Sequence, residues 1–169
     1  MSNRENMEKP DFMSDEDWAG LKDATESLER IKGDAKADVA DYLANPEGRS
    51  TGAGPSGLPT LLLSCLGRKS GEKRTTPLVF LQHGKDMVVV GSLAGYDSHP
   101  AWVLNLRANP ECWVQRDREV VKAVARNATD TERERLWEQL ITMFPPLGFF
   151  QEQTDRPFSI AVLSPTGPA

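Results

Sequence analysis

The residues with the clearest capacity for chemistry lie at 67–76, which read Gly-Arg-Lys-Ser-Gly-Glu-Lys-Arg-Thr-Thr. Four cations and one acid stand here between two apolar runs, in a chain whose net charge is −5. Glycines expose backbone N–H groups, and converging Arg and Lys side chains bind phosphate or carboxylate through charge-assisted hydrogen bonds. The pattern fits an anion-binding loop, and it equally fits a solvated turn between strands. Composition alone does not identify the anion.

A segment of small residues, Gly91–Asp97, follows a β-branched run. Small side chains allow a planar ligand to approach the backbone closely, and the hydroxyl of Ser92 could hydrogen-bond it. A plain strand-to-helix connection has the same composition, so both interpretations stay open. His99 precedes a proline and is expected to be a structural loop residue, because no Ser/His/Asp or Cys/His set can be assembled around it.

Two other patterns are rejected. Residues 52–57 match G-x-G-x-x-G, but that fingerprint needs a strand before it and a helix after it, whereas a linker precedes and a strand follows. Cys65 and Cys112 are far apart in the sequence and form no metal-ligand spacing with His83 or His99. We therefore expect buried reduced thiols and no metal site.

The N-terminal part of the chain is predicted to be helical. Trp18, Leu21, Leu28 and Ile31 recur roughly on one helical face, with Ser14 or Asp15 available as the cap. A second helix is expected over Ala35–Leu43, and Asn45–Gly57 is rich in Gly, Pro and Ser, which is typical of a linker. Residues 1–57 are thus interpreted as a helical extension and linker.

From Pro59 onward the pattern changes to short apolar runs separated by turns. Helices are expected at about 98–108 and 129–143, the second opened by the capping box Thr129-Asp130-Thr131-Glu132. A hairpin around His83–Asp86 is expected to join the second and third strands. The predicted strands are Thr60–Cys65, Thr76–Leu81, Met87–Val90, Cys112–Gln115, Val120–Arg126 and Phe158–Leu163.

Tight turns between successive strands predict a mainly antiparallel sheet that can close into a small barrel, and so an α+β, mainly β, fold class. The barrel domain is expected over residues 58–165, with 166–169 as a tail. At 169 residues and 38 % hydrophobic content, the chain has material for one core.

Charge and hydropathy exclude several classes of protein. Residues 1–50 hold 13 acids against 7 bases, so the chain repels polyanions and a nucleic-acid partner is not expected. No run approaches 18 apolar residues, and Met1–Pro10 lacks the apolar region of a secretory signal. We therefore expect a cytoplasmic protein.

An ordered string of motifs resembles the deazaflavin-dependent nitroreductase family, actinobacterial reductases that use coenzyme F420. The resemblance covers roughly Leu58 to Pro165, and the helix around Val39–Leu43 is also similar to longer members. The motifs are Gly67–Gly71, Arg74–Leu78, Val88–Ser92, His99–Trp102, Asn105–Pro110, Thr154–Arg156 and Val162–Pro165.

The resemblance implies a split β-barrel of the type that binds FMN or F420, with the deazaflavin in its groove. It implies hydride transfer from the reduced coenzyme to a quinone, an enone or a nitro compound. It also assigns roles to individual positions. Arg68, Lys69 and Arg74, assisted by Thr75, match residues that hold the phosphate and the polyglutamate tail. Pro77 matches the wall beside the ring, Ser92 a serine near the reactive face, and Trp102 and Asn105 the helix that closes the pocket.

This chain departs from the family pattern at the expected acceptor wall. Some members place tyrosines in the segment after the long helix, where this chain has Phe144, Leu147 and Phe150. The acceptor pocket is therefore expected to be more apolar, and core packing is the alternative role of each residue. We expect Ser92 or a backbone N–H to donate to the oxygen on which charge develops as hydride arrives.

Three alternatives remain open. Split barrels also accept FMN, although a shorter phosphate tail needs fewer cations than residues 67–76 provide. A non-catalytic protein that stores F420 would share the same binding residues. The N-terminal helices could dock to a membrane, but their acidic character argues against an anionic surface. Their Trp18/Leu21/Leu28 face is available to a partner or to the second subunit of a homodimer.

Overall fold

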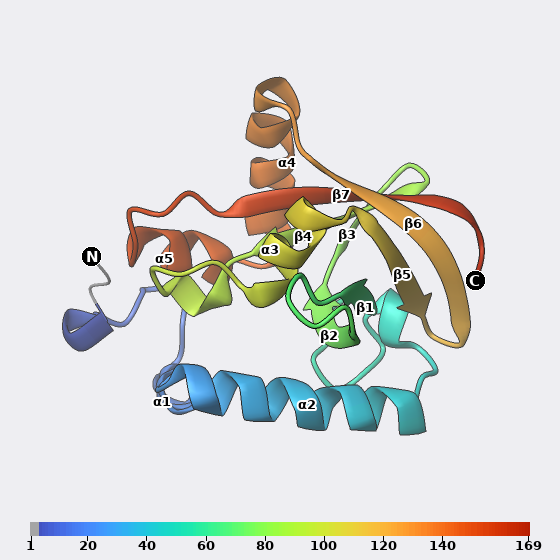
Figure 1. Cartoon of the computed structure of the whole chain (residues 1–169). Helices are drawn as coiled ribbons and strands as arrows, with labels where there is room; N and C mark the ends of the chain where they lie inside the picture. The colour runs from blue at the N-terminus through green and yellow to red at the C-terminus, as the bar shows by residue number, and fades with distance from the viewer. Residues whose placement is uncertain (1–3) are drawn as a thin grey trace.

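A seven-stranded antiparallel sheet forms the centre of the computed structural model, which describes residues 4–169 (Figure 1). Its strand order is β2-β1-β5-β6-β7-β4-β3. The sheet curls into the half-barrel expected for an α+β split-barrel protein, which confirms the predicted fold class. The strands are β1 (Thr60–Leu66), β2 (Lys73–Val79), β3 (Leu81–His83), β4 (Asp86–Gly91), β5 (Glu111–Arg116), β6 (Glu119–Asn127) and β7 (Ser159–Pro168).

The curvature follows from how the two edges of the sheet are connected. β2 and β3 are the first and last strands in the sheet order, yet only Phe80 separates them in the chain. The sheet must therefore curl until its edges meet at this residue. Phe80 is 2 % exposed, and its N–H donates to the carbonyl of Pro59 at 3.0 Å.

The predicted pairing of the second strand is wrong for most of its length. Residues 76–79 belong to β2, which pairs with β1 in the register Leu63↔Thr76, whereas only β3 pairs with β4, in the register Leu81↔Val88. The turn at residues 67–72 brings β2 back onto β1, and the bend at Phe80 separates it from β3. The predicted hairpin around His83–Asp86 is confirmed, with shorter arms.

The helices that begin at Asp15 and Asp130 start at the caps that the sequence indicates, whereas the helix expected from about residue 98 begins at Ala101, after Pro100. Ser14 Oγ accepts from Asp17 N, and Thr129 and Glu132 form the predicted capping box. The apolar face predicted over 18–31 is divided between two helices, because Ser27 caps a new helix after Thr25. The helices are α1 (Asp15–Ala24), α2 (Leu28–Ala44), α3 (Ala101–Ala108), α4 (Asp130–Met143) and α5 (Pro146–Glu152), with 3-10 turns at η1 (Arg4–Asn6), η2 (Arg49–Thr51) and η3 (Leu93–Gly95).

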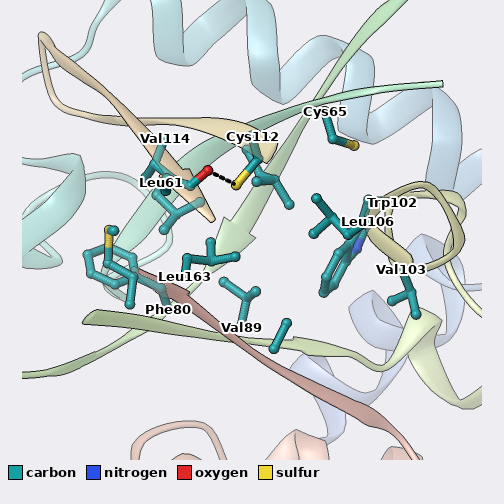
Figure 2. Close-up of a cluster of buried hydrophobic side chains, with 14 residues drawn as sticks. Leu61, Cys65, Phe80, Val89, Trp102, Val103, Leu106, Cys112, Val114 and Leu163 are labelled. Atoms are coloured by element: carbon teal, nitrogen blue, oxygen red, sulfur yellow. Dashed lines mark hydrogen bonds between the residues drawn. The ribbon is translucent and has the colours of Figure 1, made fainter. Parts of the chain in front are cut away.

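Apolar side chains fill both faces of the sheet. The inner face packs against α3, as Figure 2 shows for Trp102, Leu106 and the strand residues around them. The outer face of β4 and β7 packs against α4 and α5 through Val88, Val162 and Leu140. Alternation along each strand assigns successive residues to these two faces. The same alternation determines which predicted site residues share a face.

The N-terminal extension is joined closely to the barrel. Tyr42 on α2 is 1 % exposed, and its hydroxyl donates to the Thr60 carbonyl at 3.0 Å and accepts from Asp117 N at 3.0 Å. At the other end, residues 166–168 continue β7 and pair with β6 (Val121↔Pro168), so they are part of the sheet rather than a tail. In the described part of the chain, no helix has both the length and the apolar content to span a bilayer.

Candidate functional site

The cationic segment forms the tight turn between β1 and β2. Gly67 N donates to the Glu72 carbonyl and Gly71 N to the Gly67 carbonyl, both at 2.8 Å. Gly71 has φ +71°, and a Cβ on Gly67 would lie 2.8 Å from Ser70 Oγ. The positive φ of Gly71 therefore favours glycine there, whereas the close neighbour of Gly67 is a side-chain hydroxyl that can rotate away. The turn holds Arg68 and Lys69 at its tip.

The charge of this turn is largely uncompensated. Within residues 4–169, no carboxylate lies within ion-pair distance of Arg68 or Lys69, and Arg74 contacts only the neighbouring Glu72, at 3.1 Å. Lys73 Nζ lies 4.0 Å from the ring centroid of Trp113. Unpaired cations on a rigid turn suit a multiply charged anion, and this is the observation by which the chain fits a coenzyme with a phosphate and carboxylate tail.

Asn105 fixes this turn to α3. Its side-chain oxygen accepts hydrogen bonds from Arg68 N at 3.1 Å and from Arg68 Nη1 at 3.0 Å, and Asn105 is only 4 % exposed. The opposite side of its amide lies 4.0 Å from Cys65 Sγ. Asn105 therefore positions a cation instead of pointing into an open pocket.

Strand alternation divides the predicted coenzyme residues between two faces. Arg74 pairs with Cys65, which lies on the inner face beside Asn105. Thr75 pairs with Ser64 on the outer face, and their hydroxyls are 2.7 Å apart. Pro77 shares the outer face with Thr75. The structure thus brings Arg68, Arg74 and Asn105 to one side of the β1–β2 hairpin, and Thr75 and Pro77 to the other.

Ser92 follows the end of β4, the strand that forms a hairpin with β3. That hairpin pairs Leu81 with Val88 and does not continue along the chain to Val79 and Pro77, which pair with β1. In the described structure no strand pairing joins β2 to β4 there, since β2 has turned to β1. Ser92 Oγ has no hydrogen-bond partner within residues 4–169, so a polar group free to bind lies at the end of β4.

Arg156 holds the backbone around Ser92, a role that the sequence patterns did not predict. Its guanidinium donates to the carbonyls of Gly91 at 2.9 Å, Ser92 at 2.8 Å and Tyr96 at 2.8 Å. Burial lowers the pKa of Arg156, and Asp97 acts in the opposite direction. A signal was present in the sequence, because Arg156 belongs to one of the motifs that carry the family resemblance.

The loop after Ser92 has an unusual backbone. Leu93 and Ala94 adopt positive φ values of 43° and 50°, and a Cβ on Gly95 would lie 2.5 Å from the Phe150 carbonyl. Such conformations persist only where the surroundings determine them, and they cluster at binding sites. Here the close approach of Gly95 joins the Ser92 loop to α5.

The three residues expected at the acceptor wall lie near Ser92 but are mostly covered. Leu147 and Phe150 are 5 % and 6 % exposed, and Phe144 is partly buried. They belong to two outer-face clusters that both include Val90, two residues before Ser92. The structure therefore brings them to the same face as Ser92, and their contact with an acceptor stays a prediction.

Other residues lie in the core. Trp102 is 7 % exposed within the inner cluster, so its predicted contact with the coenzyme also stays a prediction. Cys65 and Cys112 pair across β1 and β5 as free buried thiols, and burial raises the pKa of Cys112 to about 12. Burial, with Arg107 and Arg156, lowers the pKa of His99, which favours a neutral ring. Over residues 4–169, no group of side chains suits a metal ion.

Comparisons with known proteins find chains of similar sequence and fold. A putative F420H2-dependent quinone reductase of Mycobacterium tuberculosis is 34 % identical over 110 residues, covering 64 % of this chain and 91 % of the relative. The solved structure of an F420H2-dependent reductase of type FDR-A superposes with a TM-score of 0.58 at 33 % identity, covering 63 % of this chain and 94 % of that one. A structure described as a domain-swapped dimer gives a TM-score of 0.60 at 29 % identity, covering 76 % and 96 %.

The family model for F420H2-dependent quinone reductases matches residues 37–165. That range starts within α2 and includes the cationic turn, the Ser92 loop, α3 and Arg156. The chain therefore belongs to the F420H2-dependent quinone reductase family, whose members are oxidoreductases that use the deazaflavin coenzyme F420.

Proposed function

We propose that this protein catalyses hydride transfer from F420H2 to a quinone, with residues 67–75 binding the coenzyme tail and Ser92 beside the reacting atoms. When bound, F420H2 supplies the hydride from C5 of its deazaflavin ring. The observation that carries the proposal is the turn at residues 67–72, where Arg68 and Lys69 have no carboxylate within ion-pair distance in residues 4–169 and Arg74 forms an ion pair only with Glu72. Four residues of strand, about 13 Å, separate Lys73 from Pro77.

The cations would hold the tail while β2 directs the rest of the coenzyme along the sheet edge. Arg68 is prepared for this role, because Asn105 fixes one side of its guanidinium and leaves the other donors free. Lys69 and Arg74 add charge at the exposed tip. Thr75 and Pro77 would form a wall on the outer face. Pro77 has no backbone N–H, so this wall has one hydrogen-bond donor fewer.

Ser92 would act on the acceptor. Negative charge develops on a quinone oxygen as hydride arrives, and a positioned hydroxyl donor can contribute about 2–4 kcal/mol at that step. Arg156 keeps Ser92 in place by binding three carbonyls of its loop. The final proton would come from water.

The test follows oxidation of F420H2 by its absorbance, with menadione as acceptor and with FMNH2 and NADPH as alternative donors. We expect turnover with F420H2 alone, and a Ser92→Ala variant with a kcat reduced about 30- to 1,000-fold at unchanged affinity for F420. Tight F420 binding without turnover toward any quinone, enone or nitro acceptor would instead support a storage protein. Preference for FMNH2 would contradict the assignment of the coenzyme.

A homodimer is the assembly that we propose for this chain. The apolar side chains Val120 and Val124 on β6 are each 39 % exposed, and the neighbour described as a domain-swapped dimer has the same fold. Light scattering coupled to size exclusion measures the mass directly, and a monomer at micromolar concentration would contradict the proposal.

A further inference from the structure

An apolar groove of about 480 Å³ lies between α1 and the start of α5. Its walls include Phe12, Gly20, Leu21 and Ala24 on one side and Pro145 and Pro146 on the other, with Asp17 as the charged member. Phe12 is 56 % exposed at its rim. The volume lies in the range of small-molecule sites.

The groove borders the segment that carries the expected acceptor residues. Pro145 and Pro146 are the two residues between Phe144 and Leu147. On the other wall, Leu21 packs against the cluster that contains Phe150. The segment that carries the expected acceptor positions thus supplies one wall of the groove, and Leu21 of the other wall packs against the cluster of Phe150.

The helix that forms the groove is held in place by specific contacts. Trp18 packs edge-on against Phe149 of α5 with ring centroids 5.6 Å apart. The carbonyl of Thr25, at the end of α1, accepts from the Tyr96 hydroxyl at 2.8 Å and from Arg4 at 2.6 Å. Arg4 also donates to the Ala94 carbonyl. These contacts attach α1 both to α5 and to the loop that follows Ser92.

The wall formed by α1 lies outside the part of the chain that the family model matches. The family model begins at residue 37, after α1. The M. tuberculosis relative has less than a tenth of its length outside its alignment with this chain, which is too little for α1 and the first half of α2. The groove is thus a feature that this chain does not share with that relative.

We infer that this groove binds an apolar substituent of the quinone acceptor, and that α1 makes the protein selective for acceptors that carry one. The inference rests on the proposed function, because the ring of the same quinone would lie beside Ser92. An alkyl or prenyl chain suits the groove, since its walls offer apolar contact and few hydrogen-bonding groups.

The test compares menadione with its analogue that carries one prenyl chain on the quinone ring. The Gly20→Leu variant fills the groove, and a Cβ at Gly20 meets no atom within 4 Å, so the helix should tolerate it. Gly33→Leu on α2 is the matched control, a glycine in an equally open helical position away from the groove. Phe12→Ala removes the rim.

We expect Gly20→Leu to raise KM about tenfold for the prenylated quinone and to leave KM for menadione unchanged, with kcat similar for both. Phe12→Ala should raise the same KM about threefold, and Gly33→Leu should match the unaltered protein. Equilibrium dialysis of the prenylated quinone against protein without coenzyme should show the weakest binding for Gly20→Leu and intermediate binding for Phe12→Ala. Gly33→Leu should bind it as tightly as the unaltered protein.

If the ratio of the KM values for the two quinones is the same in all four proteins, the groove does not bind the prenyl chain, and the proposed function is unaffected. If no quinone is reduced by any of them, the proposed function fails. Dialysis then still decides about the groove, because it requires no turnover.

Discussion

Two donors of Arg68, its backbone N–H and its Nη1, converge on one oxygen of Asn105 at 3.1 and 3.0 Å. This contact joins a surface turn to a buried position on α3, 37 residues later in the chain. It fixes the orientation of a cation that would otherwise be a flexible surface side chain. Preorganisation of this kind lowers the entropic cost of binding an anion.

Replacing both Lys69 and Arg74 with alanine should weaken F420 binding by about 2–4 kcal/mol, because charge-assisted hydrogen bonds to the tail are lost. The remaining affinity should depend less on salt concentration than that of the unaltered protein. Fluorescence titration with F420 at two ionic strengths measures both effects. The control replaces Lys85 and Arg135, two exposed cations elsewhere, and unchanged affinity in the Lys69/Arg74 variant would exclude the turn as the tail site.

The Asn105→Ala variant should lose about 1–3 kcal/mol of unfolding free energy, because the Arg68 N–H loses its acceptor in a partly buried site. It should also bind F420 more weakly, since Arg68 is no longer held. Urea unfolding and F420 titration separate the two effects. Asn109→Ala removes only an exposed contact to Glu111 N and should change neither value by more than about 1 kcal/mol.

Gly95→Ala should destabilise the protein by at least about 2 kcal/mol, because the added methyl group meets the Phe150 carbonyl at a positive φ. Gly57→Ala is the matched control: its φ is +70°, but a Cβ there meets no atom within 4 Å. It should cost only about 1 kcal/mol. Equal losses of stability in the two variants, measured by thermal unfolding, would show that Gly95 does not approach the Phe150 carbonyl closely.

Acid should weaken the cap of α4. The Arg126 side chain, followed by the Thr129 N–H, lowers the pKa of Glu132 from 4.5 to about 2. A depressed pKa contributes stability above the unfolded value, and that stability is lost as pH falls from about 4.5 toward 2. Glu132→Gln should therefore differ from the unaltered protein in urea unfolding at pH 6 and converge with it near pH 2.

Both cysteines should resist modification in the folded protein. Burial raises the pKa of Cys65, and burial and Cys65 raise that of Cys112 to about 12, so little thiolate forms at pH 8. A colourimetric thiol reagent should titrate no cysteine in the native state and both in denaturant. Rapid reaction of one thiol in native protein would contradict the burial of that side chain.

Local features of this fold were predictable from sequence, and long-range ones were not. The Thr129/Glu132 capping box and the Ser14 cap depend on residues three positions apart, and both are confirmed. The strand that pairs with β2 depends on the bend at Phe80. Sequence periodicity does not predict this bend, because apolar residues continue on both sides of Phe80.

The same distinction applies to the site. The glycines and cations of residues 67–76 are adjacent in sequence, so their anion-binding capacity was visible. The role of Arg156 arises from contacts across about 60 residues, and its charge resembled that of any surface arginine until the fold placed it against three carbonyls. The covered state of Phe150 likewise depends on α1, whose position the sequence did not indicate.

Strand β2 is an edge strand, because it pairs only with β1 in the sheet. An unpaired strand edge can pair with other chains and so promote aggregation. Lys73, Arg74 and Pro77 lie on this strand. Lysine and proline are the residues with which natural proteins discourage such growth. The residues proposed for the coenzyme are thus also of the kinds that keep an edge strand from pairing with other chains, so a more apolar β2 is expected to lose both properties.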